Sequence, residues 1–149
     1  MIKNKTTAVW LSFLGGPLGL HRFYLKGFFD PLGWALPVPT ALGLYGLERI
    51  KQFGLDDGLS WVLIPLLGFT VAGCALTAIV YGLMEPVRWN AKFNPGEVAS
   101  EPAGNTHWLT IAAVVLSLLV GSTALIASIV YSFQSYFEYQ IDESRKISQ

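Results

Sequence analysis

The sequence predicts an all-α polytopic membrane protein, in which a short helical hairpin precedes two long transmembrane helices. Of the 149 residues, 52% are hydrophobic and 13% are charged, whereas about a quarter are charged in soluble domains. Asp, Glu, Lys and Arg are absent from residues 6–20, 31–47, 59–84 and 108–137. Because a soluble globule needs polar outer faces on its surface helices, charges confined between long apolar stretches largely exclude that class.

The composition also excludes several functions. The net charge is zero, so the sequence lacks the basic surface that nucleic-acid binding requires. His21 and His107 fall in different segments and Cys74 is the single cysteine, so we expect no metal centre and no other cofactor. The Ser and Thr residues of the last apolar stretch have no His or acid beside them to activate a nucleophile. We therefore do not expect an enzyme.

The first two apolar stretches are shorter than a full membrane crossing. Residues 6–20 cover about 22 Å as a helix, against a hydrocarbon core of about 30 Å. We expect an uncleaved membrane segment, whose helix continues through residues 21–25 unless the bilayer thins; a re-entrant hairpin is the alternative. Asp30 directly precedes the second stretch, residues 31–47, and is placed to cap the start of its helix. Pro37 and Pro39 remove two backbone donors, which predicts a break or kink.

Residues 59–84 and 108–137 exceed the about 20 residues that a crossing needs, so both are expected to span. Between them, Trp89 and Phe93 of the hydrophilic loop are expected to rest on the membrane surface. The predicted organisation is a hairpin at residues 1–52, a loop and third transmembrane helix at 53–84, a hydrophilic loop at 85–107, and a fourth helix with a polar tail at 108–149.

An even number of crossings places both termini on one side of the membrane. That side would hold six basic residues and the other side four, which favours cytoplasmic termini under the positive-inside rule. The six are Lys3, Lys5, Arg49, Lys51, Arg145 and Lys146, and the four are Arg22, Lys26, Arg88 and Lys92.

One local pattern carries more information than the rest, the string GGPLGLHRFYLKG at residues 15–27. Its glycines allow close backbone approach in lipid. Burying its His and Arg at membrane depth costs free energy unless they reach the interface or a partner. Its two aromatic residues are typical of the membrane interface. The residues concerned are Gly15, Gly16, Gly19, His21, Arg22, Phe23 and Tyr24.

The charges near this string have a simple structural interpretation. Arg22, Lys26 and Asp30 follow one another at a spacing of four, so Arg22 or Lys26 is placed to bond Asp30 and tie the turn between the first two helices. For His21 and Arg22, we favour an interfacial turn anchor over a contact point for a lipid headgroup, an ion or a partner. Glu48 is expected to lie at a solvated helix end.

The string resembles the TM2 domain, a two-helix membrane module of many bacterial and some eukaryotic proteins. The resemblance covers about residues 3–51 and includes a Gly-rich second helix with Gly43 and Gly46. Lys26 before Gly27, and Glu48 in place of the usual Asp, depart from the family pattern. The resemblance implies a membrane-embedded module without established catalytic activity or cofactor, and we expect the bacterial inner membrane as its location.

These observations favour a structural or interaction subunit: a small scaffold, accessory or lipid-contacting protein. The alternative is an oligomeric channel or transporter component that uses the Pro-broken second helix, because discontinuous helices often form transporter binding sites. Small residues recur at four-residue spacing in both long stretches, which favours close helix packing. We therefore expect the lipid bilayer, a second copy or other membrane proteins as partners.

Overall fold

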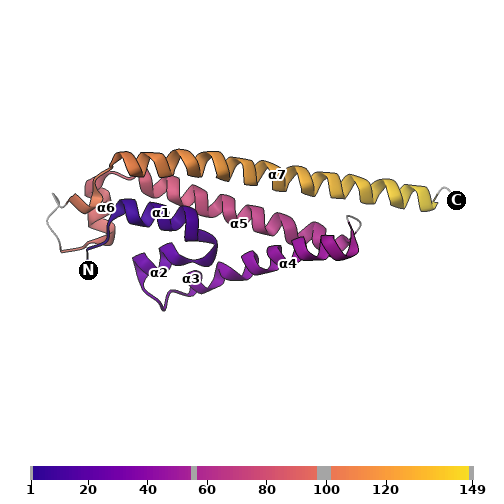
Figure 1. The fold of residues 1–149 in the computed structure, drawn as a ribbon, viewed down its shortest axis with the longest axis horizontal. Helices are drawn as coiled ribbons and strands as arrows, with labels where there is room; N and C mark the ends of the chain where they lie inside the picture. The colour runs from indigo at the N-terminus through magenta and orange to yellow at the C-terminus, as the bar shows by residue number, and fades with distance from the viewer. Residues whose placement is uncertain (1, 55–56, 97–101, 148–149) are drawn as a thin grey trace.

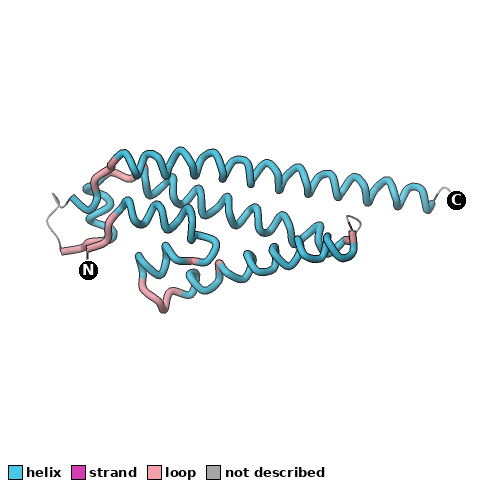
Figure 2. Tube along the Cα trace, in the orientation of Figure 1, coloured by secondary structure: helices cyan, strands magenta, loops and turns pink. Residues whose placement is uncertain are grey.

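The computed structural model describes residues 2–54, 57–96 and 102–147. This part of the chain forms helices and no strand, so the predicted all-α class is confirmed. The helices lie along one long axis (Figures 1 and 2). In chain order they are α1 (Lys5–Gly15), the 3₁₀ turn η1 (Gly16–Leu18), α2 (Leu20–Lys26), α3 (Pro31–Ala35), α4 (Pro37–Phe53), α5 (Gly58–Gly82), α6 (Pro86–Phe93), η2 (Pro102–Gly104) and α7 (Trp108–Ile147).

Two helices are long and apolar enough to cross a membrane: α5 and the segment that contains α7. They pack antiparallel, and α5 contacts α1, α4 and α7. The 40 residues of α7 span about 60 Å, so its C-terminal part extends past the ends of α4 and α5 (Figure 1). The tail expected after residue 137 is therefore a direct continuation of the last helix.

The first apolar stretch does not continue as a helix through residues 21–25, so that expectation is wrong. α1 ends at Gly15 after 11 residues, and the chain reverses through η1 and Gly19, whose φ is +75°. A side chain at Gly19 would also overlap the carbonyl oxygen of Gly33. Pro17 and a left-handed glycine together stop the helix, and α2 runs back along α1.

Two hydrogen bonds fix this reversal. The backbone N–H of Asn4, at the start of α1, donates to the Tyr24 hydroxyl at 2.9 Å. The Lys3 ammonium donates to the carbonyl oxygen of Leu25, near the end of α2. The start of α1 and the end of α2 therefore lie together at one end of the molecule.

Because of the reversal, the two termini lie at opposite ends of the long axis (Figure 1). Elements α3 and α4 lead to the far end, α5 returns, and α7 leads to the far end again. The chain reverses within residues 6–20 instead of continuing as one helix through them. The number of membrane crossings and the side of each terminus stay predictions.

The predicted break at Pro37 and Pro39 is a boundary between two helices. Leu36, between α3 and α4, keeps helical dihedral angles of −64° and −38°. Both prolines lie in the first turn of α4, where a missing N–H costs little. The Thr40 hydroxyl donates to the carbonyl oxygen of Pro17 at 2.8 Å, which joins α4 to the reversal.

Glycines set the distance between α5 and its neighbours. A Cβ atom added to Gly16 in η1 would lie 2.5 Å from the Cβ atom of Cys74, and one added to Gly121 in α7 would lie 2.6 Å from that of Ala75. Gly43 and Gly46 in α4 meet α5 in the same way. In lipid, such close approach stabilises helix contacts through van der Waals packing.

A small apolar cluster closes the end that holds the N-terminus. Trp89 and Phe93 of α6 are buried against Ala8 and Leu25. The Trp89 indole N–H donates to the carbonyl oxygen of Lys3 at 2.9 Å. The expectation that Trp89 and Phe93 rest on the membrane surface is therefore wrong: the apolar face of α6 packs against α1 and α2 instead.

We predict that Gly43→Ala destabilises the protein by about 1–3 kcal/mol, because the added methyl group overpacks the contact with Leu67. Gly73→Ala is the matched control, since no atom lies within 4 Å of its added Cβ. The control should leave stability unchanged or raise it by up to about 1 kcal/mol through helix propensity. Thermal unfolding in detergent, followed by circular dichroism, measures both; equal midpoints would refute the close contact.

Candidate functional site: a groove beside His21 and Arg22

A groove of ≈ 530 Å³ lies between α2, α3–α4 and α5, and we call it the lateral groove. Its volume falls within the range of small-molecule sites. It joins residues 21–39, in the middle of the region that resembles the TM2 domain, to residues 69–81 of α5. It is lined by His21, Arg22, Leu32, Ala35, Leu36, Pro39, Phe69, Thr70, Gly73, Cys74, Thr77 and Tyr81.

His21 is buried at this groove, with 3% of its surface exposed. In the described part of the chain, its Nδ1 atom has no hydrogen-bond partner. The turn at Gly19 starts α2 so that its first residues lie beside α5. A buried polar atom left without a partner costs about 1–3 kcal/mol, so the His21 imidazole keeps an unused hydrogen-bonding position beside the groove.

Arg22 and Asp30 form an ion pair across the turn between α2 and α3. The Nε–Oδ2 distance is 2.5 Å and the Nη2–Oδ1 distance is 3.3 Å. Asp30 also caps α3 by accepting from the backbone N–H of Gly33 at 3.0 Å. The bond from Arg22 lowers the pKa of the Asp30 carboxyl. The structure thus gives Arg22, and not Lys26, the bond to Asp30, and the pair brings no net charge to the groove.

The other residues singled out in the sequence lie outside the groove, apart from Pro39. Phe23 packs against Phe28 and Trp34 with ring centroids 5.5 and 5.4 Å apart, while Tyr24 bonds the start of α1. Glu48 is exposed near the far end of α4 and pairs with Lys51 at 2.6 Å. Gly15 and Gly16 contact Leu20 and Cys74 respectively at the reversal.

Sequence reasoning missed the α5 wall of the groove. Thr70, Cys74, Thr77 and Tyr81 recur at helical spacing on one face of α5, within a stretch that was interpreted only as a lipid-spanning helix. This spacing of polar and polarisable side chains was the signal in the sequence. It indicates a face that packs against other protein elements rather than against lipid alone.

Sequence reasoning also missed a second ion pair at the opposite end of the molecule. Arg49 in α4 bonds Asp57, the residue that caps α5, with distances of 2.8 Å (Nε–Oδ2) and 2.7 Å (Nη2–Oδ1). The bond lowers the pKa of the Asp57 carboxyl well below its usual value. Both pairs follow one pattern, Arg-x₄-Gly-x₂-Asp, in which the glycine ends a helix with a positive φ. The glycines are Gly27 and Gly54, with φ of +93° and +85°.

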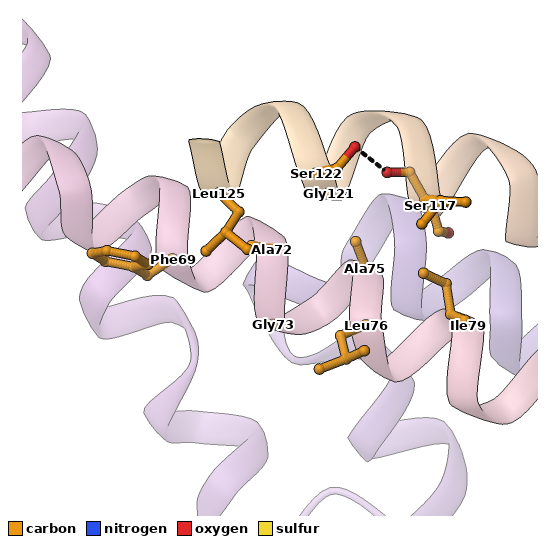
Figure 3. A pocket seen from close by; sticks show the side chains of 11 residues that line it. Phe69, Ala72, Gly73, Ala75, Leu76, Ile79, Ser117, Gly121, Ser122 and Leu125 are labelled. Carbon is orange, nitrogen blue, oxygen red and sulfur yellow. Dashed lines mark hydrogen bonds between the residues drawn. The ribbon is translucent and has the colours of Figure 1, made fainter. Parts of the chain in front are cut away.

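A second hollow of ≈ 400 Å³ lies between α5 and α7 (Figure 3). Its walls are almost wholly apolar, and small residues such as Ala72, Ala75 and Gly121 create it. The Ser122 hydroxyl at its edge donates to the carbonyl oxygen of Leu118 at 2.6 Å. The Ser117 hydroxyl, also in its lining, has no hydrogen-bond partner among the described residues, so the hollow offers mainly apolar contact and one unused hydroxyl.

Among the described residues, no group of three His, Cys, Asp or Glu side chains is placed to hold a metal ion. Comparison of the chain with protein-family models, with curated proteins and with solved structures found no match. The resemblance to the TM2 domain therefore stays a prediction.

We predict that Arg22→Ala lowers the yield of folded protein and the unfolding midpoint more than Arg88→Ala. Loss of Arg22 leaves the Asp30 carboxylate, with 11% of its side chain exposed, without its cation, at a cost of about 1–3 kcal/mol. Arg88 is exposed on α6, so its removal should change stability by less than about 0.5 kcal/mol. Yield by size-exclusion chromatography and midpoint by circular dichroism measure both. Equal losses would contradict a role for the ion pair.

Proposed function

We propose that this chain is a small polytopic membrane protein that acts as a lipid-contacting structural or interaction subunit. The observation that carries the proposal is the large apolar surface left outside the bundle. Val62, Leu76 and Leu119 are 61–69% exposed, and similar side chains cover the outer faces of α4, α5 and α7. In water such a surface drives aggregation, whereas in a bilayer the acyl chains solvate it.

The charges support placing the long axis across the membrane. The middle of α5 and of α7 contains no formal charge. In this placement α3–α4, α5 and α7 cross the bilayer, while α1 and α2 enter from the N-terminal end and return to it. Six basic residues then lie at the N-terminal end and four at the other, so the positive-inside rule places the N-terminal end in the cytoplasm. The six are Lys3, Lys5, Arg22, Lys26, Arg88 and Lys92, and the four are Arg49, Lys51, Arg145 and Lys146.

A structural role fits the interior better than transport does. A carrier that uses a broken helix needs unwound backbone carbonyls to hold its cargo, and Leu36 at the α3–α4 boundary keeps helical dihedral angles. The two ion pairs tie turns at helix ends. The apolar hollow between α5 and α7 (Figure 3) and the part of α7 beyond the bundle offer surface to a second copy or another membrane protein.

Alkaline extraction followed by flux measurement tests this proposal. We expect the protein to float with phospholipid vesicles after a carbonate wash, because acyl chains solvate its outer faces. We also expect vesicles that contain it to leak ions no faster than protein-free vesicles. Recovery in the carbonate supernatant would contradict membrane integration. Ion flux that disappears in Pro37→Ala or Pro39→Ala would instead favour the channel or transporter alternative.

A further inference from the structure

The lateral groove has a polar wall and an apolar wall. His21, Thr77 and Tyr81 bring an imidazole and two hydroxyl groups to the polar wall. Leu36, Pro39 and Phe69 bring apolar side chains to the apolar wall. A ligand that fills such a groove needs a hydrogen-bonding head and an apolar tail.

The polar wall favours a ligand whose head group carries no net charge. Arg22 lines the groove, but its guanidinium is already paired with Asp30 at 2.5 Å, so an anionic head would have to compete with that carboxylate. Nδ1 of His21, which no described residue satisfies, donates or accepts according to its tautomer. The Thr77 hydroxyl already donates to the carbonyl oxygen of Gly73 at 2.9 Å, so its oxygen remains able to accept. A hydroxyl group, both donor and acceptor, matches this wall.

The apolar rim indicates that the ligand enters from the lipid. Leu32 and Phe69 line the groove, and both are substantially exposed. In the membrane placement proposed above, these side chains face acyl chains. An amphiphile that diffuses in the bilayer therefore reaches the groove sideways, without its tail crossing water.

We propose that the lateral groove binds a neutral lipid with a hydroxyl-bearing head, of the diacylglycerol class, with the hydroxyl on His21 and the tail along Phe69. This inference rests on the membrane placement of the proposed function. It goes beyond that function by naming a site and a class of ligand.

Photolabelling in vesicles tests the site. The full-length protein is reconstituted in phosphatidylcholine with diacylglycerol that carries a diazirine in one acyl chain, and labelled peptides are identified by mass spectrometry. We expect saturable labelling of α2, α4 and α5, removed by excess unlabelled diacylglycerol. A phosphatidic acid probe with the same chains should label these peptides at least about five-fold less, since an uncompensated buried charge is disfavoured.

Two variants and one matched control make the result specific. His21→Phe removes the imidazole and should lower labelling about five-fold or more, the loss expected for one buried hydrogen bond. Ala35 lines the lateral groove and not the hollow between α5 and α7, so Ala35→Trp fills the groove, should abolish labelling and serves if His21→Phe does not fold. His107→Phe changes an exposed histidine outside the groove and should label as the unaltered protein does.

Several outcomes would overturn the inference. These are equal labelling by the two probes, stronger labelling by phosphatidic acid, labelling confined to α7, and full labelling of a folded His21→Phe or Ala35→Trp variant. Protein that fails to float with the vesicles would instead overturn the proposed function. Protein that floats and shows no selective labelling overturns only the ligand assignment.

Discussion

Close backbone approach to α5 is the constraint on which the rest of the structure depends. Gly16, Gly43 and Gly121 bring η1, α4 and α7 against this helix, where a methyl group would overlap side chains of α5. In lipid, helices gain little from the hydrophobic effect when they associate, so such contacts have to supply the stability. The lateral groove lies between α2, α3–α4 and α5.

The two Arg–Asp pairs fix the direction of the chain where one helix ends and the next begins. In each pair the arginine belongs to one helix, a left-handed glycine ends that helix, and the aspartate caps the next one. Because the carboxylate accepts both from the guanidinium and from the backbone of the new helix, one side chain fixes the turn and starts the helix. The pairs lie on either side of α3–α4, and they set where this element begins and ends.

The sequence was sufficient to predict the elements that depend on local chemistry. The charge-free stretches indicated α5 and α7, Asp30 was recognised as a helix cap, and the spacing indicated a bond to Asp30 from either Arg22 or Lys26, of which the structure has Arg22. The reversal at residues 16–19 was not predicted, because the first helix was expected to continue through these residues to about residue 25. The positive φ of Gly19 is also fixed by contact with Gly33, a residue distant in the chain. The groove could not be predicted because its walls come from three elements whose packing depends on that reversal.

The sidedness of the two ends tests most directly the central claim that the chain crosses the bilayer three times. Native Cys74 is buried, with 3% of its surface exposed, so Lys92→Cys and Glu143→Cys each introduce one accessible thiol, in α6 and near the end of α7. In sealed vesicles of known orientation, a membrane-impermeant maleimide should label these two thiols from opposite faces, Lys92→Cys from the cytoplasmic face. Labelling of both from the same face would contradict the reversal within the membrane and restore four crossings.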